Sequence, residues 1–177
     1  AGRVSIGFTA VSGYHLVPKI VAQARASLPN VELDLREMVS GDQVDALLIG
    51  LIDVGFVRPP VDRAEFDTLC LLHEPLVAAL PAGDPRLGKA SLTPRDFDGR
   101  PLIMYARQGA GYFHAMLLGL FDAAGVVPDY VHHVTQIHSM LGLVHAGLAA
   151  AIVPESAAGL HMLDVQFRRF ATTPEKP

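Results

Sequence analysis

The sequence predicts an α/β protein made of two Rossmann-like lobes joined by a hinge. Apolar runs typical of buried strands alternate with helical patterns in both halves of the chain, and this alternation favours parallel sheets. Extended segments near residues 73–82 join the halves, and the proline- and glycine-rich residues 81–85 indicate a turn. In open α/β sheets, ligands bind outside the carboxyl ends of the strands. A binding cleft is therefore expected where the strands end.

Three strands and two helices are expected in the first half. The strands lie at residues 3–8, 31–37 and 53–57. Apolar residues recur with a helical period after Ser12, and Pro18 fits only the first turn of that helix. Ser40 and Gln43 match the capping box S-x-x-Q, which predicts that the second helix begins there.

The second half repeats the alternation after two extended segments, at residues 66–72 and 76–80. Strands are expected at residues 101–105, 130–134, 149–153 and 165–170, and helices at 113–124 and 140–147. We expect the first lobe to span residues 1–73 and the second lobe 74–165. Residues 166–177 are expected to form a return crossing and a C-terminal tail.

Composition narrows the class of function. The chain has 177 residues, half of them hydrophobic, and a formal net charge of −4. Nucleic-acid binding by this segment alone is not expected, because phosphate contacts require a basic face. The one cysteine, Cys70, lies in an apolar run and is predicted to pack in the core, and a single thiol suits a reducing, cytoplasmic location. No signal peptide or membrane-spanning run is visible, and the abrupt start suggests a fragment.

Short segments in order along the chain resemble the effector-binding domain of LysR-type transcriptional regulators. They are residues 6–8 (IGF), 16–18 (LVP), 28–31 (LPNV), 36–38 (REM), 52–56 (IDVGF), 73–77 (HEPLV), 80–85 (LPAGDP), 141–147 (LGLVHAG) and 152–154 (IVP). Residues 36–38 and 55–58 look most like the subgroup that responds to aromatic acids and muconate-type diacids. The ordered set carries the resemblance, since each segment is short.

The resemblance implies a fold of the type II periplasmic-binding-protein kind, with a small effector held between two lobes. It also implies that DNA is bound only through a winged helix-turn-helix domain preceding this one, and that a further strand and helix follow it. The family self-associates as dimers or tetramers, which implies pairing through the first helix and the strand edges. No cofactor is implied.

Hydroxyl groups at two predicted strand ends are candidate ligand contacts. Ser12 is either a helix cap or a hydroxyl that holds a carboxylate beside free backbone N–H groups. Ser40 is a capping residue whose hydroxyl can also donate to a ligand. The resemblance places ligand contacts at Val11 and Ser12, although the muconate-responsive members carry their serine at the position of Val11.

Arg58 follows the third predicted strand and precedes two prolines. Its guanidinium could bind a carboxylate through two parallel hydrogen bonds. The alternative is an exposed arginine that pairs with Asp53 or Asp62.

The second lobe offers apolar candidates at positions that the resemblance assigns to the effector pocket. Phe113 lines the pocket or belongs to the apolar stripe of its helix. Ile137 and His138, at the start of the next helix, are expected pocket walls.

Other classes of function find little support. His132, His133, His138 and His145 lack the spacing of a metal site, and no nucleophile–base pair has a recognisable spacing. We therefore expect an effector-sensing domain that binds a small organic acid, aromatic or dicarboxylic. A stand-alone solute-binding protein of the same fold is the alternative, which the lack of a visible export signal disfavours.

Overall fold

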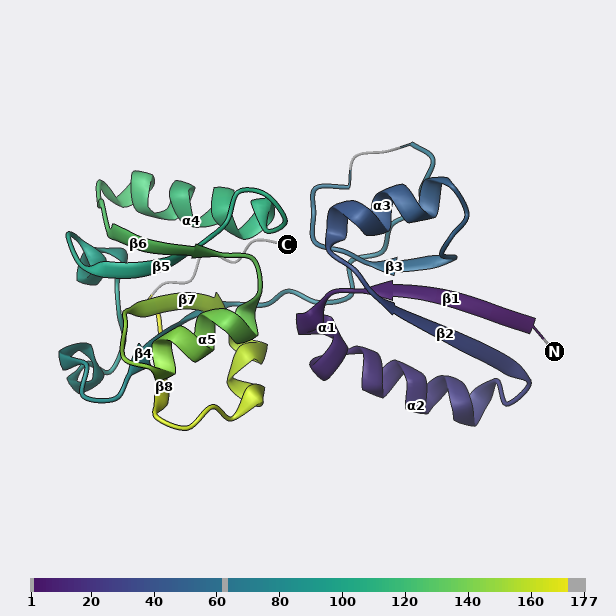
Figure 1. The fold of residues 1–177 in the computed structure, drawn as a ribbon, viewed down its shortest axis with the longest axis horizontal. Coiled ribbons are helices and arrows are strands. Elements are labelled where there is room, and N and C mark those ends of the chain that lie inside the picture. The colour runs from purple at the N-terminus through teal and green to yellow at the C-terminus, as the bar shows by residue number, and fades with distance from the viewer. Residues whose placement is uncertain (1, 62–63, 172–177) are drawn as a thin grey trace. The chain divides into compact units, whose positions relative to one another are not determined.

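The structure is a computed structural model that describes residues 2–61 and 64–171. The chain divides into two compact units, of which the first ends at Leu69 and the second begins at Cys70. Each unit has its own β-sheet with helices packed on it (Figure 1), as the alternation of strand and helix predicted. In the described ranges, no helix has both the length and the apolar character needed to cross a membrane.

The first unit is built on a three-stranded parallel sheet with the order β2-β1-β3. The strands are β1 (Gly2–Phe8), β2 (Val31–Glu37) and β3 (Val54–Phe56). Phe8 lies opposite Glu37 on one side and Phe56 on the other. All three strands therefore reach their carboxyl ends at the same edge of the sheet, where the sequence predicted a binding site.

Three helices belong to this sheet: α1 (Ala10–His15), α2 (Val17–Ser27) and α3 (Ser40–Leu48). The single helix predicted after Ser12 is two helices that meet at Leu16, and Pro18 lies in the first turn of α2 as predicted. Figure 1 shows α2 and α3 on opposite sides of the strands. A Cβ added to Gly7 would lie 2.6 Å from Cδ1 of Ile52 and 3.0 Å from Gln43 of α3, so glycine at position 7 lets α3 approach β1 closely.

The second unit contains a mixed five-stranded sheet with the order β6-β5-β7-β4-β8. The strands are β4 (Leu76–Pro81), β5 (Pro101–Tyr105), β6 (Asp129–Val134), β7 (Ala150–Pro154) and β8 (Val165–Arg169). Strand β5 is parallel to β6 and β7, whereas β4 is antiparallel to β7 and β8. The helices are α4 (Gly111–Ala124), α5 (Ile137–His145) and the short 3₁₀ helices η1 (Pro85–Gly88), η2 (Pro94–Phe97) and η3 (Glu155–Leu160).

The core of the second unit lies between this sheet and its helices. Leu117 of α4, and Met140 and Leu141 of α5, are fully buried, as the helical spacing of the apolar residues requires. Strand β4 is buried over residues 76–80, because a strand flanked by two others can be covered on both faces. Gly125 ends α4 in the left-handed conformation, with a φ of 63°, so α4 ends at Ala124, as does the helix predicted over residues 113–124.

The segment predicted to be extended at residues 66–72 forms no β-strand. Residues 66–75 have no regular secondary structure and connect the two units. Leu69 is 81% exposed and Cys70 is also exposed, so the prediction that Cys70 packs in the core is wrong. An apolar run becomes a buried strand only where another strand or layer covers it, and sequence alone does not reveal that cover.

The strand expected at residues 165–170 is present and belongs to the second sheet. Residues 165–169 form β8, which pairs antiparallel with β4 and so belongs to the second sheet. Val165 and Phe170 are buried, and the Phe170 ring stacks on Phe97 with 5.9 Å between centroids. These apolar side chains hold the segment in the second core. Residues 172–177 lie outside the described residues.

Candidate functional site

The segments that follow the three strands of the first sheet are joined by hydrogen bonds. The backbone N–H of Met38, just after β2, donates to the carbonyl oxygen of Phe8 at the end of β1, at 2.9 Å. The backbone N–H of Arg58, just after β3, donates to Oγ of Ser40 at 3.0 Å. The structure thus brings together two residues, Ser40 and Arg58, that the sequence singled out separately.

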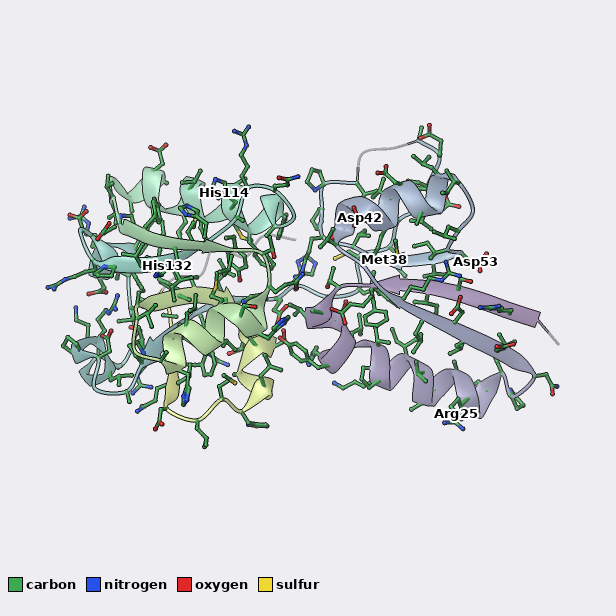
Figure 2. The ribbon with its side chains drawn as sticks, viewed as in Figure 1. Arg25, Met38, Asp42, Asp53, His114 and His132 are labelled. Carbon is green, nitrogen blue, oxygen red and sulfur yellow. The ribbon has the colours of Figure 1, made fainter. Side chains whose placement is uncertain are left out.

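Ser40 does not cap α3, so the predicted capping box is wrong. Val39 is the N-cap residue and makes no side-chain capping hydrogen bond, while Ser40 is the first helical residue. Met38 and Asp42 mark this end of the helix in Figure 2. The hydroxyl of Ser40 accepts the Arg58 N–H instead, and a hydroxyl that accepts a hydrogen bond keeps its own proton for donation.

Gln43, the other half of the predicted capping box, has a different role. Its side chain is completely buried, and Nε2 donates to the carbonyl oxygen of Met38 at 2.9 Å. Sequence reasoning missed this contact because the S-x-x-Q spacing offered a local explanation for both residues.

Ser12 is engaged within the first turn of its own helix. Thr9 is the N-cap of α1, and Ser12 closes a capping box with it. Oγ of Ser12 accepts the Thr9 N–H at 3.0 Å and lies 2.9 Å from the Thr9 carbonyl oxygen, to which it donates. Ser12 is therefore the third residue of the helix rather than its cap. A ligand that needed its hydroxyl would displace one of these bonds. Val11, the preceding residue, has a buried side chain.

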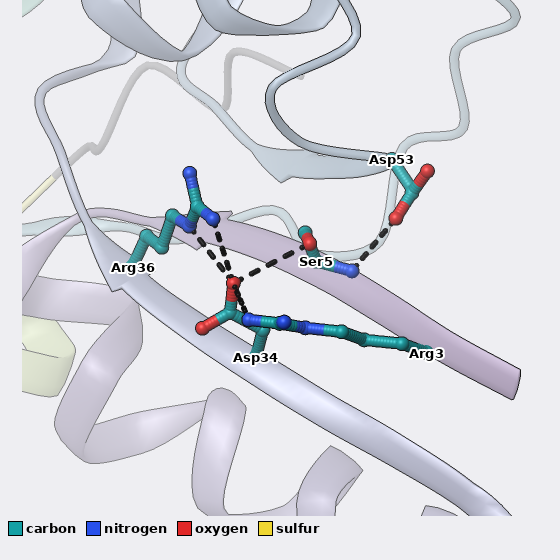
Figure 3. Close-up of polar contacts among 5 residues, drawn as sticks. All are labelled: Arg3, Ser5, Asp34, Arg36 and Asp53. Carbon is teal, nitrogen blue, oxygen red and sulfur yellow. Dashed lines mark hydrogen bonds and ion pairs between the residues drawn. The ribbon is translucent and has the colours of Figure 1, made fainter.

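The expected partners of Arg58 are placed elsewhere or lie outside the described residues. Oδ2 of Asp53 accepts the backbone N–H of Ser5 at 2.7 Å (Figure 3), next to the bond that the Asp53 N–H donates to the Ser5 carbonyl oxygen. Asp62 falls in the range that the structure leaves undescribed. The Arg58 side chain is half-buried.

A charged cluster on the first sheet was not foreseen from the sequence. Oδ2 of Asp34 lies 2.8 Å from Nη2 of Arg3 and 2.8 Å from Nη2 of Arg36 (Figure 3). The hydrogen bond from Arg36, helped by Arg3, holds the pKa of the Asp34 carboxyl below its usual value despite partial burial. Arg3 is largely exposed, so these pairs contribute little to stability.

In the second unit, the loop after β5 contacts the loop after β6. The Ala106 N–H donates to the carbonyl oxygen of Val134 at 2.8 Å. Gly109 has a φ of 84°, and a Cβ at that position would lie 3.2 Å from Cγ2 of Thr135. Glycine is required there for both its backbone angle and this close approach. The loops that lead to Phe113 and to Ile137 are thus neighbours at the carboxyl ends of the parallel strands β5 and β6.

The three candidates of the second unit are placed differently from one another. Phe113 is buried and stacks on Tyr105 with 4.7 Å between ring centroids, and Ile137 is buried as well. Packing in the core accounts for both side chains. His138, in the first turn of α5, is exposed.

The histidines do not form a metal site in the part of the chain that the structure describes, where no group of three or more potential ligands occurs. His114 on α4 and His132 on β6 are labelled in Figure 2. Nδ1 of His114 donates to the carbonyl oxygen of Tyr105 at 2.7 Å, and Nδ1 of His145 donates to that of Leu163 at 2.6 Å. These two rings therefore serve the packing of their helices.

Comparison with known proteins gives consistent matches. The model of the family described as LysR substrate binding domain matches residues 1–175. The HTH-type transcriptional regulator AlsR of Bacillus subtilis (strain 168) is 33% identical over 168 residues, which cover 95% of this chain and 56% of AlsR. The chain thus spans little more than half the length of this relative.

Solved structures agree with the sequence matches. The BenM effector binding domain with its effector benzoate has a TM-score of 0.84 and 25% identity, over 97% of this chain and 78% of that one. Full-length CbnR, a protein complexed with its target DNA, has a TM-score of 0.86 and 26% identity, over 98% of this chain and 61% of that one.

Proposed function

This chain belongs to the LysR substrate binding domain family, the effector-binding part of a class of transcriptional regulators, and on that premise we propose that it senses a small organic acid. The observation that supports this proposal most directly is the Ser40–Arg58 contact at the carboxyl ends of β2 and β3. It places a hydroxyl, a guanidinium-bearing residue and a helix N-terminus in one neighbourhood.

The chemistry of this neighbourhood suits a carboxylate. Ser40 can donate its hydroxyl proton, and Val39 offers no side-chain acceptor to the first-turn N–H groups of α3. The positive end of the helix dipole favours an anion there. We propose that Ser40 and Arg58 hold the carboxylate, with the backbone at Val11 and Ser12 as a further contact.

The second unit holds three further residues that we propose as ligand contacts. They are Phe113, Ile137 and His138, with exposed His138 as the direct contact and the two buried side chains as its support. BenM, whose domain has been solved with benzoate, makes an aromatic acid the first ligand to test. A dicarboxylic acid is the second.

The wider role of the protein is proposed from the same relatives. Full-length CbnR has been solved with its target DNA, and this chain matches 61% of CbnR. Because this chain has an acidic balance, we propose that a separate domain of the full-length protein binds DNA. We propose a cytoplasmic regulator that self-associates as a dimer or tetramer. An effector shifts a conformational equilibrium only if it has different affinities for the alternative states.

A thermal-shift screen tests the proposal. Benzoate, salicylate and muconate are added to the wild-type chain and to Ser40→Ala, Ser12→Ala and the control Ser27→Ala on α2. A ligand at one hundred times its dissociation constant stabilises the fold by about 2.7 kcal/mol. We expect a shift in the wild type and the control, and its loss in Ser40→Ala.

Two outcomes would count against the proposal. No shift with any of the three acids, from a folded sample, would contradict the assigned ligand class. A shift that survives Ser40→Ala would place the carboxylate elsewhere.

A further inference from the structure

We infer that Gln43 is a positioning residue for the proposed effector site, fixing the turn that carries Ser40 to Arg58. The ligand in this inference comes from the proposed function, whereas the positioning role of Gln43 rests on the geometry of its contacts. Gln43 lies in α3, one turn after Ser40, and its side chain points away from solvent.

The first step of the argument is the placement of the side chain. Within residues 2–61 and 64–171, Gln43 is the one polar or charged residue that is fully buried. It lies against two glycines that face each other in the sheet, Gly7 of β1 and Gly55 of β3. A Cβ would approach Oε1 of Gln43 to 3.0 Å at the first glycine and to 3.2 Å at the second. The two glycines thus leave room for this amide above the strands.

The second step is what the amide holds. Nε2 of Gln43 donates to the carbonyl oxygen of Met38, while the Met38 N–H donates to the Phe8 carbonyl oxygen. Met38 is therefore fixed on both sides of its backbone, and it lies two residues before Ser40. The chain between β2 and α3 can then present the Ser40 hydroxyl to Arg58 in one geometry.

The third step concerns energy. Oε1 of Gln43 is buried and has no hydrogen-bond partner among the residues that the structure describes. A buried polar atom without a partner costs stability, so an apolar side chain of similar size would serve a purely structural purpose better. Gln43 is a poor residue for packing alone, yet its amide holds the backbone at Met38 beside the proposed ligand site. This combination is expected of a positioning residue.

The test compares Gln43→Met, which keeps the length of the side chain but cannot donate, with Gln43→Glu, which can donate only when protonated. Gln23→Met and Gln23→Glu on the exposed face of α2 are the matched controls. The readout is amide hydrogen exchange at Arg58, divided by exchange at Asp53. The Asp53 N–H donates to the carbonyl oxygen of Ser5 in β1, so its exchange rate reports the opening of the first sheet.

In Gln43→Met we expect the ratio of Arg58 exchange to Asp53 exchange to rise at least about fivefold above the wild-type ratio. An increase of this size corresponds to the loss of one hydrogen bond of ordinary strength. In Gln43→Glu the ratio should return toward the wild-type value between pH 8 and pH 5, because burial at position 43 raises the pKa of the carboxyl and a protonated carboxyl can donate to the carbonyl oxygen of Met38. Neither control should change the ratio. An unchanged ratio in Gln43→Met, or a Gln43→Glu ratio that does not respond to pH, would overturn the inference.

Two further measurements keep the inference separate from protein stability and from the proposed function. If Gln43→Met does not fold, amide exchange of the Gln43 side chain in the wild type tests the inference instead. The Gln43 side-chain amide protons should exchange at least about tenfold more slowly than those of Gln23, since burial and a hydrogen bond both protect them, and equal rates would overturn the inference. Benzoate binding by Gln43→Met should weaken at least about fivefold if the wild type binds benzoate, and undiminished binding would overturn the inference. A wild type that binds no benzoate would count against the proposed function, while the exchange ratio would still decide the role of Gln43.

Discussion

Replacing Gly7 by alanine should destabilise the first unit, because α3 lies too close to β1 for an added methyl group. The new Cβ would lie 2.6 Å from Cδ1 of Ile52 and 3.0 Å from Cγ and Oε1 of Gln43. Ile52 is 2% exposed and Gln43 is completely buried, so neither side chain has open space into which it can move. Overpacking of this kind costs about 1–3 kcal/mol. We expect Gly7→Ala to lie near the middle of that range.

Gly41→Ala is the matched control in the same unit. Gly41 is in the first turn of α3, and an added Cβ would meet nothing within 4 Å. Alanine is a better helix former than glycine by up to about 1 kcal/mol, so this variant should be as stable as the wild type or more stable. The opposite signs of the two effects separate overpacking from any general effect of adding a methyl group.

Urea unfolding followed by far-UV circular dichroism measures both variants, since the chain has no tryptophan for fluorescence. Amide exchange in β1 reports the first unit separately from the second. A Gly7→Ala variant as stable as the wild type would refute the close approach of α3 to β1. A loss of stability in Gly41→Ala equal to that in Gly7→Ala would also refute this close approach.

Two further predictions concern the second unit and the connecting segment. Burial raises the pKa of Asp84, but hydrogen bonds from the side chain and backbone of Arg86 outweigh it and hold this pKa below its usual value. The folded-state pKa is thus lower than the unfolded one, so Asp84 stabilises the fold above about pH 4 and loses this contribution as the pH falls through the lowered value. Asp84→Asn should flatten the acid limb of the pH–stability curve, and an unchanged curve would contradict this. Cys70 is exposed, so its thiol should react with Ellman's reagent in the native protein, and Cys70→Ser should change stability by less than about 0.5 kcal/mol. A Cys70 thiol that reacts only after denaturation would show that this side chain is buried after all.

The site could be predicted in part. Ser40 and Arg58 each follow a strand, and parallel strands put such residues at one edge, so their proximity follows from topology. Their contact does not, because it joins residues 18 positions apart through a backbone N–H. The capping motif at Ser40 and Gln43 was a competing local signal. In the first unit, a capping box joins Thr9 to Ser12, where serine takes the place of the usual glutamate or glutamine.

The sequence by itself determined the alternation of strands and helices, because hydrophobic periodicity is a local property that each segment carries alone. Strand β2 at Val31–Glu37 and the stop of α4 at Gly125 are examples. Only the tertiary structure decided which apolar segments are covered and which polar groups meet. Cys70 lies exposed in an apolar run, β8 joins the second sheet, and Gln43 is buried against two glycines. Burial and hydrogen bonding depend on neighbours that are distant in sequence, and no local pattern specifies these neighbours.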